Sequence, residues 1–188
     1  MVVYFGSFFE RNNKETILFA GKKISLWGKC PLLSFIIKDA EAMKKLGEIL
    51  GSLLNEGNIV CLSGELGAGK TVLAGGIAKG LGVKEHVTSP TFTLIKEYKG
   101  KFPLYHVDVY RLDDPAEIFE LGLDEYLYGQ GVTVIEWADR IKEYLIADYM
   151  NIKIEKLGDE KRMVKISSNS SNYTHITREL ERKCTFLR

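Results

Sequence analysis

The chain has 188 residues and a formal net charge of +1, and 45% of its residues are hydrophobic and 27% charged. This length and composition predict one globular domain with room for short extensions. The near-neutral charge argues against a dedicated nucleic-acid binder, which usually carries a strongly basic face. Neither a CxxC pair nor an apolar run of roughly 20 residues occurs, so we expect no zinc site, no disulfide framework, no membrane span and a cytoplasmic protein.

The residue pattern divides the chain into three parts. Residues 1–34 are mixed, basic and aromatic without clear periodicity, and this N-terminal extension could form a short hairpin or stay loose. Residues 35–166 are densely patterned and make up the predicted domain. Residues 167–188 are rich in serine and asparagine and then charged, so we expect a C-terminal tail that could include a short helix.

Apolar runs and helical spacing predict alternating strands and helices in the central part. In chain order we expect a strand at 35–37, a helix at 40–54, a strand at 59–62, a helix from 70 to about 80, strands at 93–98 and 104–110, a helix at 115–121, a strand at 132–135, and a hairpin of strands at 152–156 and 162–166. Asp39 has the residue type preferred at a helix N-cap, and Asp114 followed by Pro115 has the pattern that opens a helix. This alternation is typical of an α/β protein, and the hairpins make the sheet mixed and partly parallel.

A glycine-rich loop between a predicted strand and a predicted helix gives the most specific signal in the chain. The segment GELGAGKT fits the phosphate-binding pattern G-x-x-x-x-G-K-[ST]. Its glycines let several backbone N–H groups point at one anion, the lysine would reach the β- and γ-phosphates, and the threonine hydroxyl would bind Mg²⁺. The nucleotide-binding residues predicted here are Gly64, Glu65, Leu66, Gly67, Ala68, Gly69, Lys70 and Thr71. The expected fold is therefore a three-layer α/β fold of the P-loop NTPase kind, with a nucleoside triphosphate and Mg²⁺ as ligands.

A P-loop site also needs an acid that holds Mg²⁺ and a group that orients the attacking water. Asp108 and Glu136, each towards the end of a predicted strand, are the candidates. The alternative for Asp108 is a solvent-facing strand residue that pairs with Arg111 or Lys101. The alternative for Glu136 is a carboxylate stabilised by the N-terminus of a following helix.

Three neighbouring features allow more than one interpretation. The segment 88–93, TSPTFT, lies between the P-loop helix and the next strand, so its hydroxyls could sense a γ-phosphate, or it could be a simple turn. His106 is more typical of a hydrogen-bonded strand residue than of a Mg²⁺ ligand, because Mg²⁺ prefers oxygen. Trp137 is more typical of a core residue than of one that stacks on a ligand.

The order and spacing of four segments resemble those of the TsaE family (older name YjeE): SGELGAGKT, VTSPTFTLIKEY, LYHVDVYRLDDPAEIFELGLDEYL and VTVIEWADR. The likeness covers about residues 35–166, and both ends of the chain lack a counterpart. TsaE is the small bacterial ATPase of tRNA threonylcarbamoyladenosine biosynthesis. The resemblance implies that the chain binds ATP and Mg²⁺, hydrolyses ATP slowly alone, and docks on the TsaB–TsaD pair. Hydrolysis would reset that pair between turnovers, so tRNA would be involved only indirectly.

The resemblance also implies roles for individual residues. Lys70 would act in catalysis and, with the rest of the loop, hold phosphate, while Thr71 would bind Mg²⁺. Glu136 is the first choice for a second Mg²⁺ ligand and Asp108 for positioning water, although the two roles could be exchanged. The remaining residues expected at the nucleotide are Trp137, which matches the family's tryptophan, and Asp39 and Arg162, which would contact the base or ribose.

Two other functions fit the same loop. A small-molecule kinase usually encloses the transferred phosphoryl group with an arginine-rich lid. Arg111 and Arg140 follow the loop without forming such a cluster, which counts against a kinase. The other alternative is a binding module that reads the nucleotide state with little turnover.

Overall fold

The computed structural model describes residues 16–19, 22–25, 33–114, 117–120 and 122–185. Within the N-terminal extension, β1 (Thr16–Phe19) and β2 (Lys22–Ser25) pair antiparallel as a separate two-stranded sheet. Of the two forms that the sequence allowed for this extension, the described residues therefore adopt the hairpin.

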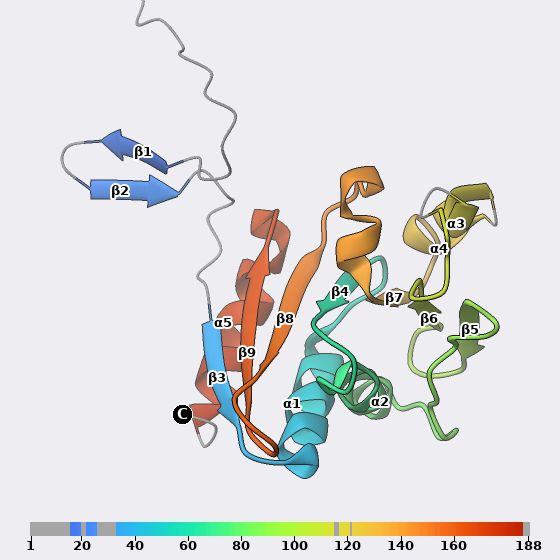
Figure 1. The fold of residues 1–188 in the computed structure, drawn as a ribbon, viewed down its shortest axis with the longest axis horizontal. Coiled ribbons are helices and arrows are strands. Elements are labelled where there is room, and N and C mark those ends of the chain that lie inside the picture. Colours follow the sequence, from blue (N-terminus) through green and yellow to red (C-terminus); the bar gives the residue numbers. More distant parts are fainter. Residues whose placement is uncertain (1–15, 20–21, 26–32, 115–116, 121, 186–188) are drawn as a thin grey trace, which may run out of the picture.

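A mixed sheet forms the centre of the domain. Its strands are β3 (Leu33–Ile37), β4 (Ile59–Ser63), β5 (Ile95–Tyr98), β6 (Leu104–Asp108), β7 (Val132–Glu136), β8 (Met150–Lys156) and β9 (Arg162–Ser168). They lie side by side in the order β3-β9-β8-β4-β7-β6-β5 (Figure 1). The four strands β8, β4, β7 and β6 run parallel, and antiparallel strands flank them on both sides. The expected mixed, partly parallel sheet is confirmed.

Helices cover both faces of this sheet and complete a three-layer fold. The helices are α1 (Ala40–Leu53), α2 (Lys70–Gly80), α3 (Glu117–Glu120), α4 (Leu123–Leu127) and α5 (Thr174–Lys183), with short 3₁₀ turns η1 (Ala138–Arg140), η2 (Lys142–Tyr144) and η3 (Ser171–Tyr173). One hydrophobic cluster joins α1, α2 and α5 to the sheet, and a second joins α3, α4 and η1 to the other face. None of the helices in the part of the chain that the structure describes has the length and hydropathy of a membrane span.

Several expected elements differ from the observed ones at their ends, and the strand expected at 104–110 ends at Asp108. The helix expected at 115–121 is present as α3 only, and Pro115 lies outside the described residues. The strand expected from residue 93 begins at Ile95, because Thr93 and Leu94 donate their amides to the carbonyl of Pro90 in a turn. The amides of Thr93 and Leu94 are therefore used by a turn and are not available for pairing with a neighbouring strand.

Close contact between α1 and α2 fixes the helix that follows the phosphate loop. Asp39 caps α1, since its carboxylate accepts a hydrogen bond from the Ala42 amide at 2.7 Å. A Cβ on Gly47 would lie 2.5 Å from the Leu73 carbonyl oxygen, and one on Gly76 would overlap backbone of α1. Glycine at these positions lets the two helices approach backbone to backbone, so α2 has little freedom to shift.

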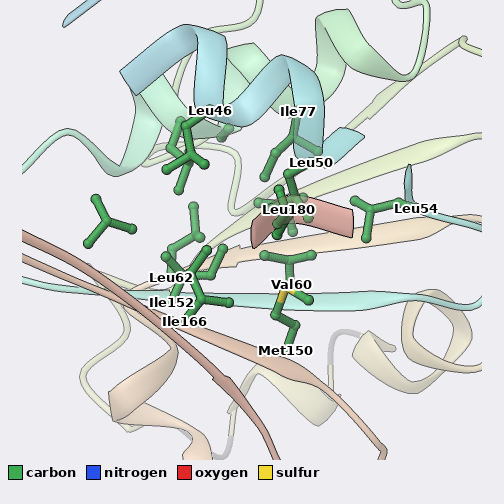
Figure 2. Packing of buried hydrophobic residues seen from close by; sticks show 14 of the residues in the cluster. Leu46, Leu50, Leu54, Val60, Leu62, Ile77, Met150, Ile152, Ile166 and Leu180 are labelled. Carbon is green, nitrogen blue, oxygen red and sulfur yellow. The ribbon is translucent and has the colours of Figure 1, made fainter. Parts of the chain in front are cut away.

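The larger core lies between these helices and the sheet, and the C-terminal segment contributes to it. Figure 2 shows Leu46 and Leu50 of α1 in one cluster with Leu62 and Ile152 of the sheet, and Leu180 of α5 packs among them. All five side chains are 0% exposed. Burying a leucine or isoleucine of this kind contributes about 1.5–3 kcal/mol. The segment after Ser168 is therefore built into the same core.

A buried tyrosine hydroxyl links the C-terminal segment to the P-loop strand. Tyr173 accepts a hydrogen bond from the Ile59 amide at 2.9 Å and donates to the Asp148 carbonyl at 3.1 Å. Burial raises the pKa of Tyr173 to about 12. The hydroxyl thus stays protonated, and it satisfies the backbone where β4 begins.

Candidate active site

The phosphate loop lies beside the ends of two other strands. In the parallel register, Glu136 is opposite both Leu62 of β4 and Asp108 of β6. The carboxyl ends of parallel strands meet at one edge of a sheet, where α/β proteins usually bind ligands. A cavity of about 560 Å³ opens there. Of the residues predicted from the sequence, its lining includes Leu66, Gly67, Gly69, Lys70, Thr71, Asp108, Glu136 and Trp137.

Three glycines give the loop its curled backbone. Gly64, Gly67 and Gly69 have φ angles of 141°, 72° and 109°, in the region that glycine enters without steric strain. Gly64 also packs against the carbonyl of Ile154, where any Cβ would overlap the backbone. The loop can adopt this conformation because glycine, which has no side chain, occupies these three positions.

Two cations from the β8–β9 hairpin hold the outer side of the loop. Lys156 Nζ donates to the Leu66 carbonyl at 2.8 Å, and Arg162 Nε donates to the Ala68 carbonyl at 3.2 Å. The C=O and N–H of a trans peptide point in opposite directions. The amide of Gly69, which shares its peptide with the Ala68 carbonyl, therefore points away from the hairpin, and Gly69 lines the cavity.

The side chain of Lys70 is buried inside the loop. Its Nζ donates to the carbonyls of Gly64 at 2.7 Å and Glu65 at 3.0 Å, and it lies 3.5 Å from the centroid of the Trp137 ring. Burial lowers the pKa of Lys70, and the nearby carboxylates, Glu136 first, offset part of this effect. A phosphate would be a stronger acceptor for this ammonium group than the two carbonyls are.

Glu136 joins the strand β7 to the P-loop. The residue is 2% exposed; its Oε2 accepts from the Thr71 hydroxyl at 3.0 Å, and its Oε1 lies 2.8 Å from His106 Nε2. A three-residue 3₁₀ turn, η1, follows Glu136 and Trp137 in place of an α-helix, and the two carboxylate oxygens contact the side chains of Thr71 and His106. The structure therefore brings Glu136 to the threonine of the phosphate loop.

Asp108 joins the neighbouring strand to the segment 88–93. Its Oδ2 accepts from the hydroxyls of Ser89 at 2.6 Å and Thr91 at 2.8 Å, and its Oδ1 accepts from the Tyr110 amide at 2.9 Å. With 2% exposure, Asp108 is not the solvent-facing strand residue of the alternative interpretation. The segment 88–93 is a turn before β5, and its hydroxyls hold an acid of the site.

Aromatic side chains form the rim of the cavity. Trp137 has a φ of 61°, and a non-glycine residue in this region stores on the order of 1–3 kcal/mol of strain. Its ring lies under Lys70 and 4.7 Å from the ring of Tyr110. Phe92 is 82% exposed, and the Arg111 guanidinium lies 4.2 Å from its ring. The half-buried Trp137 thus belongs to the wall of the cavity, and Arg111 lies at its rim.

Asp39 and Arg162 do not line this cavity. Asp39 is exposed and caps α1, and Arg162 binds loop and hairpin carbonyls, including that of Ala68. Their contact with a base or ribose stays a prediction. Met43, one turn along α1 from Asp39, lies 3.5 Å from where a Cβ on Gly69 would be, so the start of this helix is close to the loop.

Sequence patterns alone did not identify two contacts of the site. Alternation places His106 and Asp108 on the same face of one strand. This pattern could have indicated that His106 contacts Glu136, the acid of the next strand. Lys156 had no local signal, because the hairpin reaches the loop only through the pairing of β8 with β4.

The oxygen atoms of the site suit Mg²⁺. The Thr71 hydroxyl and the carboxylates of Glu136 and Asp108 are hard ligands, and Mg²⁺ commonly uses one or two carboxylates together with substrate phosphates and water. Among the residues that the structure describes, no group of three or more His, Cys, Asp or Glu side chains gathers into a complete metal site.

Comparisons with known proteins identify the family of the chain. The family "Threonylcarbamoyl adenosine biosynthesis protein TsaE" matches residues 37–164. The tRNA threonylcarbamoyladenosine biosynthesis protein TsaE of Bacillus subtilis is 43% identical over 143 residues, which cover 76% of this chain and 89% of that protein. The protein of the same name from Treponema pallidum is 42% identical over 132 residues, 70% of this chain and 98% of that one. The crystal structure of Bacillus subtilis YdiB aligns with a TM-score of 0.70 and 36% identity, covering 82% of this chain and 97% of its own. The chain belongs to the TsaE family.

Proposed function

We propose that this chain is a Mg²⁺-dependent ATPase that serves the biosynthesis of threonylcarbamoyladenosine in tRNA. In this proposal the chain works as an accessory subunit of the TsaB–TsaD pair and resets that pair by hydrolysing ATP. Its family membership supports the pathway. The observation that carries the ATPase part is the convergence of Lys70, Thr71, Glu136 and Asp108 on one cavity.

The residues of the cavity suit the parts of a phosphoryl-transfer site. Loop amides and the first turn of α2 would hold the phosphates, since the first N–H groups of a helix have no carbonyl partner within it. Lys70 would exchange the carbonyls of Gly64 and Glu65 for the β- and γ-phosphates. When bound, Mg²⁺ would neutralise developing charge on the phosphates, with Thr71 and Glu136 as its protein ligands.

Asp108 is suited to position the attacking water. Its carboxylate is buried at the cavity and is oriented by three hydrogen bonds, from Ser89, Thr91 and the Tyr110 amide. An acid held in this way can accept a hydrogen bond from water with little rearrangement. Glu136, in contrast, already contacts the threonine expected on Mg²⁺, which supports this division of roles.

The test is ATP hydrolysis by the purified chain with and without the TsaB–TsaD pair. We expect slow, Mg²⁺-dependent turnover alone and a clear increase with the pair. Lys79→Ala is the matched control for loss of a lysine, because Lys79 is an exposed residue of the same helix, paired with Glu48 and outside this cavity. Nucleotide binding without turnover under either condition would contradict the ATPase, and transfer of phosphate to a metabolite would indicate a kinase.

A further inference from the structure

A buried histidine lies directly behind one acid of the site. His106, on β6, is 0% exposed, and its Nε2 is 2.8 Å from Glu136 Oε1. The register pairs His106 with Val134 of β7, so it reaches Glu136 diagonally, two residues further along the neighbouring strand. The functional roles assigned above do not use this contact.

The environment of the ring determines the direction of this hydrogen bond. A carboxylate only accepts, so His106 donates from Nε2 to Glu136. His106 Nδ1 is buried and has no hydrogen-bond partner among the described residues. Buried N–H groups without an acceptor are rare, and a ring that carries its proton on Nε2 leaves only a lone pair at Nδ1. The ring therefore has one donor, and that donor faces Glu136.

The two oxygens of Glu136 have different partners. Oε1 accepts from His106, and Oε2 accepts from the hydroxyl of Thr71 in the phosphate loop. The histidine is part of the sheet and fully buried, whereas the Thr71 hydroxyl is the group that a metal would recruit. Oε1 is therefore held by a buried side chain that makes no other hydrogen bond within the described part of the chain, that of His106. Oε2 faces the phosphate loop.

We propose that His106 is a positioning residue, which anchors Oε1 of Glu136 and so presents Oε2 to the Mg²⁺–nucleotide complex. This inference rests on the proposed ATPase function. A free glutamate side chain can rotate its carboxylate and spend time in geometries that do not bind the metal. Partners that orient a metal-binding carboxylate typically change metal affinity or activity by 10–100-fold when they are removed.

Two amide variants of His106 separate positioning from a merely structural role. In His106→Gln, the amide nitrogen can take the place of Nε2 and still donate to Glu136. In His106→Asn, the amide is one methylene shorter and falls short of Glu136. We would measure nucleotide affinity with and without Mg²⁺, turnover, and thermal unfolding for both variants and for the unchanged chain.

We expect His106→Asn to lose about 10–100-fold in turnover and in the affinity that Mg²⁺ adds, while nucleotide affinity without metal changes by less than about twofold. His106→Gln should keep most of both. Equal, unchanged turnover and Mg²⁺ dependence in the two variants would overturn the inference. If the unchanged chain shows no hydrolysis but His106→Asn still loses the Mg²⁺-dependent gain in affinity, the ATPase proposal fails and the positioning role stands.

A measurement on the unchanged chain covers the case in which the variants do not fold. The chain has three histidines, and the other two, His86 and His175, are exposed. In a ¹⁵N-histidine NMR spectrum, the buried ring should carry its proton on Nε2, and this proton should exchange slowly with water. A proton on Nδ1 instead would remove the hydrogen bond to Glu136 and with it the inference.

Discussion

The two walls of the cavity differ in how they are held. The P-loop wall, residues 64–71, is supported by cations of the β8–β9 hairpin and by a helix that touches α1 backbone to backbone. The second wall is the segment 88–93, which the hydroxyls of Ser89 and Thr91 hold to Asp108. Its Phe92 is 82% exposed.

This difference separates holding a nucleotide from responding to it. Backbone packing in the P-loop wall leaves few alternative conformations, which suits the tight binding of phosphates. Each hydroxyl hydrogen bond to the Asp108 carboxylate contributes about 1.5–3 kcal/mol, so a ligand that competes for this carboxylate can release the second wall. We therefore expect variants of the first wall to change affinity, and variants of the second to change turnover or loop mobility.

The largest effect should come from Lys70→Ala in the P-loop wall. Losing charge-assisted hydrogen bonds to phosphate should weaken ATP binding by about 3 kcal/mol or more, roughly 100-fold. Isothermal titration with ATP would measure this, with Lys79→Ala as the control. Binding within threefold of the unchanged chain would show that this wall does not hold phosphate through Lys70.

The two acids should give the next largest effects, and in different measurements. Glu136→Gln should lower turnover and weaken the dependence of nucleotide affinity on Mg²⁺. Asp108→Asn should lower turnover by about 100-fold, as loss of a positioned base does, while the Mg²⁺ dependence of binding stays. Glu117→Gln, an exposed acid of α3, is the control. If Asp108→Asn weakened the Mg²⁺ dependence of binding and Glu136→Gln left it unchanged, the roles of the two acids would be exchanged.

The double variant Ser89→Ala and Thr91→Val should loosen the second wall. It leaves the buried Asp108 carboxylate without two donors, so the free energy of unfolding should fall by about 1–3 kcal/mol. Cleavage within 88–93 by a protease in trace amounts should become faster. Thr93→Val, an exposed threonine in the same turn, should change neither quantity. Unchanged cleavage in the double variant would argue that other contacts hold this wall.

The smallest effect should be a pH dependence of nucleotide binding. Burial lowers the pKa of Lys70, so as pH rises the ammonium group loses its proton, and its charge, below the usual 10.5. Affinity for the phosphates should then fall on the alkaline side. In Lys70→Arg this alkaline fall should vanish, because a guanidinium stays charged. Affinity that is constant up to pH 10.5 would contradict the assignment of Lys70.

Features of the fold that depend on neighbouring residues were predictable from the sequence. The strand, loop and helix around residues 59–80 follow from an apolar run, glycines and helical spacing, and the C-terminal hairpin follows from its own turn. The order of the strands was not predictable, because β8 lies between β9 and β4 through pairings far apart in the chain. The burial of α5 also depends on such distant partners.

The same distinction applies to the site. Lys70 and Thr71 belong to one motif, and Glu136 and Asp108 were predicted because strand ends meet beside that motif. The partners of these acids were not predicted, since a hydroxyl reaches Asp108 only if the turn at 88–93 follows one path among many. The positive φ of Trp137 and the contact of its ring with Lys70 likewise follow from no local sequence pattern.

The ribosome makes the phosphate motif well before the strands that support it. Strand β4 pairs with β7 and β8, which begin at residues 132 and 150. The first amide of β4, that of Ile59, donates a hydrogen bond to Tyr173. A nascent chain that stops between the phosphate loop and β8 contains all residues of the motif. It lacks Lys156 and Arg162, the hairpin side chains that hold the loop. With the proposed ATPase function, ATP capture is therefore expected only late in translation, and premature fragments of this protein should not bind nucleotide.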